Sequence, residues 1–410
     1  MSDNILFFAC NSHQEEYFDF LAQNLDNDNY NTYFLKENEL LRRGVMEFGE
    51  DNYLTKDEIE GLMNFTYLRF KAKFKGKTLL HKVYKKFLQV KAKLCEKILA
   101  KFYSEHNIDL VVVWNGTNLA PALAARLAKE FNIETLYFES GQFPNTLEID
   151  SQGVNAASSL SRKGKDFFVK QVPSQEALAK IHGIEIETRD LRMDRLTNVV
   201  KKRQVQKQAE IDLPNDFLFL PFQVYTDTQV LINSPNIDDM CELVDICYGA
   251  LEKFNQRNNK GYWLVVKEHP SDFGRIDYSD LKRRYEDENI IFVTDYDVAD
   301  LIEASQLVIT INSSVGIEAL LKYKPVITLG KANYNVEGVV NHVSKLNQLP
   351  QQIAESIFNE VNYEMIDKFL YYLRHGYLVN GNKEIPTREN NYAVLERIQE
   401  TLDGEYYEAK

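Results

Sequence analysis

Short apolar runs alternate with segments of helical periodicity through the second half of this 410-residue sequence. The apolar runs are DFLFLPF, YWLVVKEHP, IIFVTD, QLVITIN and PVITLG, and helices are expected at about 237–255, at 298–303 and from Ser313. Strands that alternate with helices are typical of a parallel, doubly wound sheet, because a parallel neighbour is reached only through a long crossover. We therefore expect a Rossmann-like domain over residues 206–349.

The first half carries a unit of the same kind. An apolar strand at 5–9 is followed later by DLVVVW, NLAPALAARLAKEFN and TLYFE, which predict two parallel strands joined by a helix. A charged helical insertion at about 57–106 separates these parts. We place a domain boundary near residue 205, which gives a first domain at 1–205, and expect the helical tail at 350–410 to pack back on it. The predicted fold class is α/β with two Rossmann-like domains.

Charge and cysteine usage narrow the class of protein. The net charge of −13 argues against nucleic acid as a partner, because phosphate binding needs a concentrated basic surface. Cys10, Cys95, Cys241 and Cys247 show neither a CxxC pair nor zinc-ligand spacing, so we expect reduced thiols and no structural zinc. The amino-terminal apolar run is too short for a signal peptide, and no window approaches the roughly 18 apolar residues of a membrane span. These features predict a globular cytoplasmic protein.

One stretch runs against the acidic balance. Between Arg69 and Lys101 the sequence has twelve Lys or Arg residues and a single acid, Glu96, interleaved with apolar residues at helical spacing. This pattern predicts a basic amphipathic helix, or a pair of helices broken near Gly76. The simpler interpretation is a solvated helix surface. The alternative is docking on an anionic membrane surface or on an anionic lipid-linked acceptor, which would make the protein peripheral at the inner membrane.

Candidate ligand-binding residues follow the strands, because open α/β sheets bind ligands beyond the carboxyl ends of their strands. In INSSVGIEAL a strand ends and a helix begins with hydroxyl groups and free backbone N–H groups, which suits a phosphate or a carboxylate. An N-cap with a small-residue turn would explain one of the serines without a ligand. The candidate residues here are Asn312, Ser313, Ser314, Gly316 and Glu318.

The motif KEHP ends another predicted strand. Lys267 and His269 are two residues apart, so they point to one side of the strand end and could hold a phosphate together, with Pro270 fixing the turn. A lone histidine is more often structural, and that interpretation stays open.

The segment LPFQVYTDTQV places a polar loop after a third strand. It contains Gln223 and Asp227, and a carboxylate in such a loop can act as a nucleophile or as a base. Taken alone, Asp227 is equally well explained as an N-cap or a loop residue.

The segment FESGQFPNTLEIDSQGVNAASS belongs to the first half. Turn chemistry explains its glycines, including Gly141, and Asn155 lies in the same long loop. Turn chemistry does not explain Glu139, an acid placed directly after a predicted strand. A Glu139 with a raised pKa could serve as general acid or base, and a structural role is the alternative.

These four segments, spread from about Trp114 to Leu329, together resemble the capsule polysaccharide synthesis family. The resemblance is to the retaining β-Kdo glycosyltransferases that make capsule linkers and some lipopolysaccharide O-antigens. It rests on the order and spacing of ESGQFPNTLEIDSQGVN, LPFQVYTDTQV, VVKEHP and TINSSVGIEAL. It implies a GT-B-like arrangement in which the second domain binds the nucleotide-sugar donor and the first binds the acceptor. The implied donor is CMP-β-Kdo, cytidine monophosphate joined to 3-deoxy-D-manno-oct-2-ulosonic acid.

The resemblance also implies roles for the candidate residues. His269 and the helix from Ser313 would bind the CMP phosphate, Lys267 or Ser314 the sugar carboxylate, and Glu318 the ribose or cytosine. Gln223, Pro270, Asn312 and Gly316 would complete the donor site, and Gly141 and Asn155 would lie on the acceptor side. Retention is most simply achieved by two displacements, with Asp227 as nucleophile and Glu139 as acid/base.

The same resemblance implies catalysis without a metal. CMP leaves already carrying its negative charge, so a histidine and a helix dipole can replace a metal ion. The sequence does spell a DxD motif at Asp295–Asp297, which we interpret as a helix start with Asp297 as its cap.

Two other functions stay open at this point. SSxGxEAL after a strand also resembles the UDP-sugar 2-epimerases, so a UDP-sugar transferase or epimerase is the alternative within enzymes. A noncatalytic module that binds polysaccharide or lipid in an assembly complex would keep the fold without the chemistry. Nucleotide binding with no turnover would distinguish that module from an enzyme.

Overall fold

The computed structural model describes residues 2–25, 29–40, 52–184 and 212–405. The chain forms two compact units. Unit 1 comprises Met1–Arg162 and Tyr377–Lys410, and unit 2 comprises Lys163–Gly376. The boundary predicted near residue 205 lies outside the described residues. The chain passes between the two units at Arg162/Lys163 and at Gly376/Tyr377. Of the predicted tail, only the part from Tyr377 onward belongs to unit 1.

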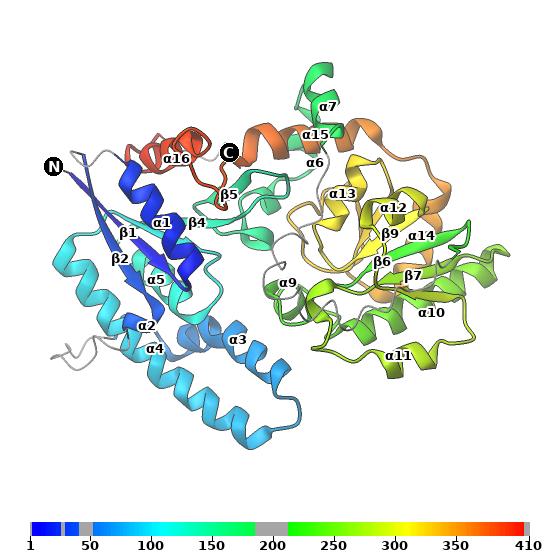
Figure 1. Ribbon diagram of the computed structural model, residues 1–410, viewed down its shortest axis with the longest axis horizontal. Helices are drawn as coiled ribbons and strands as arrows, with labels where there is room; N and C mark the ends of the chain where they lie inside the picture. The colour runs from blue at the N-terminus through cyan, green and yellow to red at the C-terminus, as the bar shows by residue number, and fades with distance from the viewer. Residues whose placement is uncertain (1, 26–28, 41–51, 185–211, 406–410) are drawn as a thin grey trace. The chain divides into compact units, whose positions relative to one another are not determined.

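Unit 1 is built on a six-stranded sheet in the order β12-β5-β4-β3-β1-β2 (Figure 1). The strands β4, β3, β1 and β2 are parallel to one another. At the other edge of the sheet, β5 pairs antiparallel with β4, and β12 pairs antiparallel with β5. The strand bounds are β1 Asp3–Ala9, β2 Tyr30–Lys36, β3 Leu110–Trp114, β4 Glu134–Ser140, β5 Thr146–Asp150 and β12 Val379–Asn380.

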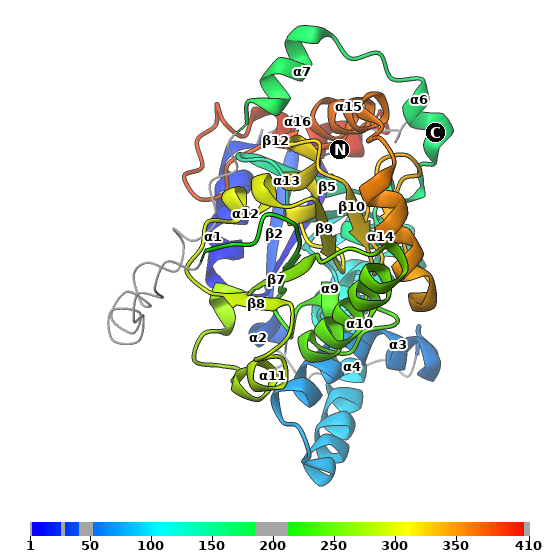
Figure 2. The same ribbon diagram turned by 90° about the vertical axis from the view of Figure 1, so that its right-hand side faces the viewer.

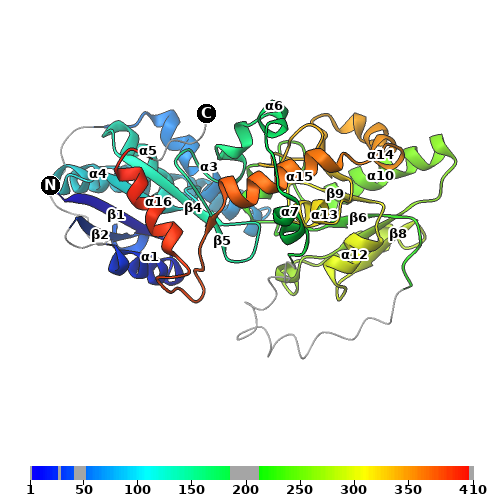
Figure 3. The same cartoon turned by 90° about the horizontal axis from the view of Figure 1, so that it is seen from above.

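Helices cover both faces of this sheet, which explains why its strands are apolar at nearly every position. Ile5 and Phe7 of β1 pack with α1 (Ser12–Asn24) and α16 (Tyr392–Leu402). Leu6 and Phe8 point to the other face and pack with α3 (Lys56–Lys73), α4 (Thr78–His106) and α5 (Leu119–Glu130). Figure 3 shows α1 and α16 on one side of the sheet and α4 and α5 on the other.

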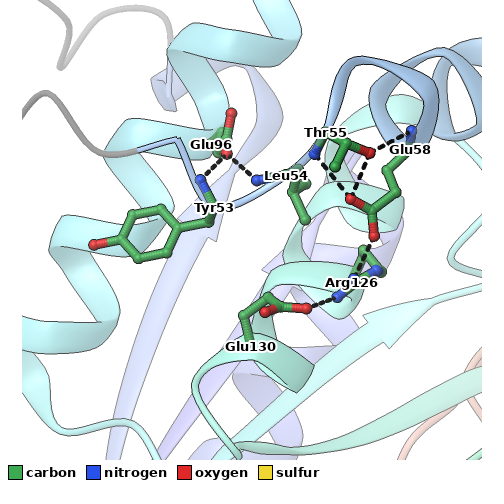
Figure 4. Close-up of polar contacts among 7 residues, drawn as sticks. All are labelled: Tyr53, Leu54, Thr55, Glu58, Glu96, Arg126 and Glu130. Atoms are coloured by element: carbon green, nitrogen blue, oxygen red, sulfur yellow. Dashed lines mark hydrogen bonds and ion pairs between the residues drawn. The ribbon is translucent and has the colours of Figure 1, made fainter.

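The helical insertion of unit 1 is fastened at its base by two polar clusters (Figure 4). Thr55 and Glu58 form a reciprocal capping box at the start of α3, and Glu58 also binds Arg126 of α5 at 2.5 Å. The buried Glu96 of α4 accepts hydrogen bonds from the backbone N–H groups of Tyr53 and Leu54, at 2.8 and 2.7 Å. These contacts tie the start of α3 to α4 and α5, while the predicted break between α3 and α4 falls at Gly76, whose φ is +78°.

Unit 2 holds a second six-stranded sheet, which is parallel throughout, in the order β11-β10-β9-β6-β7-β8. Its first strand lies in the middle, the next two extend to one side, and the last three extend to the other. This is the order of nucleotide-binding Rossmann sheets, with the switch point between β6 and β9. The bounds are β6 Phe217–Pro221, β7 Trp263–Lys267, β8 Ile290–Val293, β9 Leu307–Thr310, β10 Val326–Thr328 and β11 Asn341–His342.

The helices of unit 2 again lie on both faces of the sheet (Figure 2). The pair α10 (Met240–Asn258) and α14 (Leu349–Phe358) packs on one face, against the buried side chains of β6, β7 and β9. Further α-helices of unit 2 are α6 Lys165–Val169, α7 Gln175–His182, α9 Thr228–Leu231, α11 Ser279–Arg284, α12 Val298–Ala304, α13 Val315–Leu321 and α15 Tyr363–Tyr372. The predicted fold class, two Rossmann-like sheets with a helical insertion and carboxyl-terminal helices, is confirmed.

Candidate active site

Four loops converge at the carboxyl edge of the unit 2 sheet. They follow β6, β7, β9 and β10, and the register that pairs Pro221 with Lys267 and Thr328 with Thr310 brings the ends of neighbouring strands level. Three of these loops contain the predicted donor-binding residues, apart from Lys267, which ends β7, and Gly316 and Glu318, which lie on the helix after β9. The segments singled out in the second half of the sequence are thus brought to one edge of one sheet, on both sides of the switch point.

Gln223 and Asn312 form the bridge across the switch point. The Gln223 amide nitrogen donates to Asn312 Oδ1 at 2.9 Å, and the Gln223 oxygen accepts from the Asn312 backbone N–H and the Thr310 hydroxyl, both at 3.3 Å. The Asn312 amide nitrogen in turn faces the backbone carbonyls of Gln229, Asn233 and Lys331, at 3.0, 3.4 and 3.2 Å. Both side chains are buried, and their hydrogen bonds hold the loops after β6, β9 and β10 together.

The loop after β9, which carries Ser313 and Ser314, is fixed by hydrogen bonds to its backbone. Its Ser313 backbone N–H donates to the Thr310 hydroxyl at 3.1 Å, and the Ser313 carbonyl accepts from the hydroxyl of the buried Tyr334 at 2.6 Å. A Cβ at Gly316 would lie 2.6 Å from that same hydroxyl, so only glycine admits Tyr334 here. Helix α13 begins at Val315 rather than at the predicted Ser313, with an exposed Ser314 as its N-cap and a half-buried Glu318 in its first turn.

The KEHP loop presents a lysine and a histidine in defined orientations. Lys267 is the last residue of β7, and its buried Nζ donates to the Thr294 carbonyl at 3.3 Å. His269 Nδ1 accepts a hydrogen bond from the Ser271 backbone N–H at 3.1 Å. A neutral imidazole that accepts at Nδ1 carries its proton on Nε2, so Nε2 is the donor this ring offers to an anion.

Asp272 supports this loop and was not among the predicted residues. Its backbone N–H donates to the His269 carbonyl at 2.9 Å, and its Oδ2 accepts from the Tyr278 hydroxyl at 3.1 Å. Burial raises the pKa of Asp272 to about 6. The available signal in the sequence was an acid three residues after a histidine that closely follows a strand, which is the spacing of a tight turn.

Asp227 lies in unit 2 as the N-cap of α9. Its Oδ1 accepts from the Gln229 backbone N–H at 3.1 Å, and its side chain is exposed. The capping role weighed from the sequence is therefore present, and it leaves the carboxylate in solvent. Asp297 likewise caps α12, accepting from the Ala299 and Asp300 N–H groups, which confirms that reading of the DxD motif.

Glu139 lies in unit 1 near the carboxyl end of β4. Its two oxygens accept from the Asn115 side-chain amide at 2.6 Å and from the Ser140 backbone N–H at 2.8 Å. Lys383, from the carboxyl-terminal segment, contacts the Ser140 hydroxyl and lies 4.3 Å from the centroid of the Trp114 ring. The predicted acid thus has a fixed orientation and a lysine close by in the fold, which the sequence could not indicate because 243 residues separate Lys383 from Ser140.

The turn after Glu139 needs a glycine. The Gly141 N–H donates to the Thr146 carbonyl at 2.9 Å, and a Cβ on Gly141 would collide with the Thr146 hydroxyl. The turn returns the chain into β5, whose residues pair antiparallel with β4 so that Glu148 lies opposite Glu139 and Asp150 opposite Tyr137. Directly opposed residues share a face, so three carboxyl groups lie on the same face of these two strands.

Two of those carboxyl groups form a buried cluster with Tyr377. The Tyr377 hydroxyl lies 2.6 Å from Glu148 Oε1 and 3.0 Å from Asp150 Oδ2, and the Asn155 backbone N–H donates to Glu148 Oε1 at 3.0 Å. Both carboxyl groups are inaccessible to solvent. Burial, with smaller contributions from the charges of Asp150 and Glu139, raises the pKa of Glu148 to about 8. Asn155, predicted on the acceptor side, therefore contributes its backbone to this cluster.

Other types of site are missing from the part of the chain that the structure describes. No group of three or more His, Cys, Asp or Glu side chains in it is placed to hold a metal ion. No helix in the same residues is long and apolar enough to cross a bilayer. A hollow of about 190 Å³ lies at the amino end of β10, lined by residues that include Pro325, Val339 and Asn362, on the sheet edge opposite the four loops described above.

Comparisons with known proteins agree with the resemblance seen in the sequence. A family model described as "Capsule polysaccharide biosynthesis protein" matches residues 181–373. Protein FixF of Sinorhizobium fredii is 31% identical over 338 residues, covering 80% of this chain and 75% of FixF. The capsule polysaccharide modification protein LipB of Neisseria meningitidis serogroup A is 26% identical over 294 residues, covering 60% of this chain and 69% of LipB.

Among solved structures, the β-Kdo 2,7 transferase of Thermosulfurimonas dismutans KpsC aligns over 97% of this chain and 100% of its own, with 12% identity and a TM-score of 0.48. The sequence relationships are the stronger finding, because FixF matches along most of both chains and the family model covers the loops after β6, β7, β9 and β10 of unit 2. The chain belongs to the capsule polysaccharide biosynthesis protein family.

Proposed function

We propose that this protein is a retaining glycosyltransferase that moves Kdo from CMP-β-Kdo to a saccharide or lipid-linked glycan acceptor in the synthesis of a bacterial surface polysaccharide. The observation that carries the proposal is the edge of the unit 2 sheet, where Lys267 ends β7, His269 follows it and Ser314 follows β9. These two strands flank β6, and the Gln223–Asn312 bridge joins the loops after β6 and β9. The family membership supplies the polysaccharide context.

The donor carries two anionic groups, a phosphate and the sugar carboxylate, and the loops offer matching groups. His269 has its Nε2 as donor, and Lys267 is the cation at the end of β7. Ser314, exposed at the start of α13, adds a hydroxyl. We assign the phosphate to His269 and the loop after β9 and the sugar carboxylate to Lys267 or Ser314. Glu318 is the proposed acceptor of a hydrogen bond from ribose or cytosine.

The proposed chemistry has two displacements at the anomeric carbon of Kdo. In the first, an oxygen of the Asp227 carboxylate attacks that carbon, the bond to the phosphate oxygen breaks, and CMP leaves with the electron pair. In the second, an acceptor hydroxyl attacks the same carbon, its proton passes to Glu139, and the bond to Asp227 breaks. Each displacement inverts the centre, so the product retains the donor configuration. CMP departs as a stable anion, so no metal is required to neutralise it.

The acid/base role is given to Glu139 because of its surroundings. Asn115 and the Ser140 backbone N–H fix the carboxylate, and Lys383 donates a hydrogen bond to the neighbouring Ser140 hydroxyl. The opposite Glu148 is a potential source of like charge, but a pKa of about 8 keeps it mostly neutral at pH 7. Glu139 is thus held in one orientation, with a mostly neutral carboxyl group opposite it, and we give it the proton of the acceptor hydroxyl in the second displacement.

The test is to weigh the intact protein by mass spectrometry after incubation with CMP-Kdo generated in place. The expected result is a wild-type chain heavier by one Kdo residue, mapped by peptide analysis to Asp227, and no adduct on Asp227→Ala. The matched control is Asp297→Ala, because Asp297 is also an N-cap of a short helix in unit 2. CMP and UDP are compared as ligands by thermal stabilisation.

The outcomes separate the alternatives. Stabilisation by UDP and not by CMP, with no adduct, contradicts the proposal and favours a UDP-sugar enzyme. Stabilisation by CMP with neither adduct nor transfer favours a noncatalytic binding module. An adduct that persists in Asp227→Ala keeps the donor but moves the nucleophile to another residue.

A further inference from the structure

The first turns of α4 carry a row of apolar side chains into solvent. Leu79, Val83, Phe87 and Val90 are 76%, 58%, 51% and 68% exposed. Residues at positions i, i+4, i+8 and i+11 fall on one side of an α-helix, so these four form a continuous row, which we name the hairpin stripe. Figures 1 and 2 both show this end of the α3–α4 hairpin extending away from the strands of unit 1.

The hairpin stripe is not a loosely packed part of the core. Further along the same helix, Ala92, Cys95 and Leu99 are fully buried and belong to the core that α4 shares with α3, α5 and the sheet. The base of the hairpin is fixed by Glu96 and by the Glu58–Arg126 ion pair (Figure 4). The helix thus has a packed half and a projecting half, and the projecting half keeps apolar residues where polar ones would be expected of a solvated surface.

Within Arg69–Lys101 the exposed charge beside the hairpin stripe is positive, while Glu60 of the neighbouring α3 pairs with Lys85 at 3.1 Å. Lys82, Lys86 and Lys93 are exposed, and at 100° per residue they border the stripe along one side. The only acid between Arg69 and Lys101 is Glu96, which is 1% exposed, so no acidic side chain of this stretch reaches solvent. Such a surface is exceptional on a chain whose net charge is −13.

We propose that the hairpin stripe and its lysines dock on an anionic phospholipid surface. The apolar row enters the boundary between headgroups and acyl chains, and the lysines contact the phosphates above it. This is the binding mode of helices that lie in the plane of a membrane interface, and each lysine adds electrostatic attraction that is screened by salt. Docking of this kind would place unit 1, which carries the proposed acid/base, beside lipid-linked glycans.

A second copy of the chain is a poorer occupant. Two hairpin stripes brought together would set Lys82, Lys86 and Lys93 of one copy against those of the other, and no exposed acid in the stretch offsets them. Like charges at close range oppose such an interface. An anionic bilayer satisfies both the apolar row and the lysines.

The experiment is co-sedimentation of the full chain with vesicles of phosphatidylcholine, with and without phosphatidylglycerol. The expected result is binding that needs phosphatidylglycerol and weakens as salt is raised. Val83→Glu with Phe87→Glu, and separately Lys82→Glu with Lys86→Glu, should each weaken the partition coefficient by about tenfold or more. All four side chains are exposed, so neither double variant should disturb the fold, which the thermal transition of each checks.

Matched controls lie in unit 2. Val172→Glu replaces a valine that is 85% exposed, and Lys253→Glu reverses an exposed lysine; both should bind vesicles like the wild type. Equal binding of the stripe variants and the wild type, or equal binding to both vesicle compositions, overturns the proposal. So does a wild-type dimer that the stripe variants dissociate without any vesicle binding. The assay uses neither donor nor acceptor, so its failure is distinct from failure of the proposed transferase activity.

Discussion

At the scale of single residues, Glu148 is a carboxyl group placed where its charge is costly. It is inaccessible to solvent and lies beside Asp150, and burial raises its pKa to about 8 from an ordinary 4.5. The native state therefore holds a proton that the unfolded chain releases as the pH rises from about 4.5 to 8. Over that range the free energy of unfolding should fall as pH rises, by as much as a few kcal/mol.

Glu148→Gln removes this ionisation while keeping the oxygen that accepts from Tyr377 and Asn155. We expect the variant and the wild type to have similar stability near pH 5, and the variant to be the more stable near pH 8. Urea unfolding at several pH values, followed by the fluorescence of Trp114 in unit 1, measures the difference. If the free energies of unfolding of the two proteins changed with pH in parallel, the pKa of Glu148 in the folded protein would be that of an ordinary surface acid, and the prediction would be wrong.

The candidate site shows what residue patterns reveal and what they hide. The apolar runs identified Lys267, His269 and Glu139 as residues at strand ends, although Glu139 lies inside β4 rather than directly after it as expected. The same logic selected Gln223 and Asn312 but could not show that they bond to each other and to Asn233, since these partners lie 79 to 89 residues away. Glu148 was not among the predicted residues, and the contacts that bury it come from Tyr377, more than 200 residues away, and from the backbone of Asn155.

At the scale of elements, the α3–α4 insertion depends on a buried acid at its base. Glu96 accepts the backbone N–H groups of Tyr53 and Leu54, which lead into α3. Glu96→Ala leaves both groups without that acceptor and should lower the free energy of unfolding of unit 1 by about 2–4 kcal/mol. Urea unfolding followed at Trp114 measures this loss.

Glu105→Ala is the control on the same helix. Glu105 is exposed and faces Lys101 at 3.7 Å, and a surface pair of this type contributes at most about 1 kcal/mol. Equal effects of the two substitutions would mean that Glu96 stabilises α4 only as any helical glutamate does.

The strands and the insertion were predictable because each is encoded locally. Apolar runs such as DFLFLPF and QLVITIN bury on both faces and became β6 and β9, and Gly76 marked the break between α3 and α4. The short strand β12 was not predictable. Its two residues pair with β5, more than 200 residues earlier in the chain, and nothing in the sequence near Val379 specifies that partner.

At the scale of the whole molecule, unit 1 is assembled from two separate parts of the chain. The segment from Tyr377 onward supplies β12 and α16 to unit 1, and its Val379, Val394, Leu395 and Ile398 are buried in the core beside α1. Burying each such side chain contributes about 1.5–3 kcal/mol, so the segment supplies a large share of the roughly 5–15 kcal/mol that stabilises a typical domain. Unit 2 is formed by residues 163–376 alone, and no described strand of the segment from Tyr377 onward joins its sheet.

Truncation after Gly376 should therefore unfold unit 1 and spare unit 2. The chain has two tryptophans, Trp114 in unit 1 and Trp263 in unit 2, so Trp114→Phe and Trp263→Phe give proteins in which fluorescence reports one unit at a time. In the truncated chain the Trp114 transition should vanish or move to much lower temperature, while the Trp263 transition and its response to CMP stay as in the full chain. Tyr377→Phe, which deletes one hydroxyl and keeps the tail, should shift only the Trp114 transition, and by less than truncation. Loss of both transitions on truncation would contradict this expectation and mean that unit 2 depends on unit 1 for its fold.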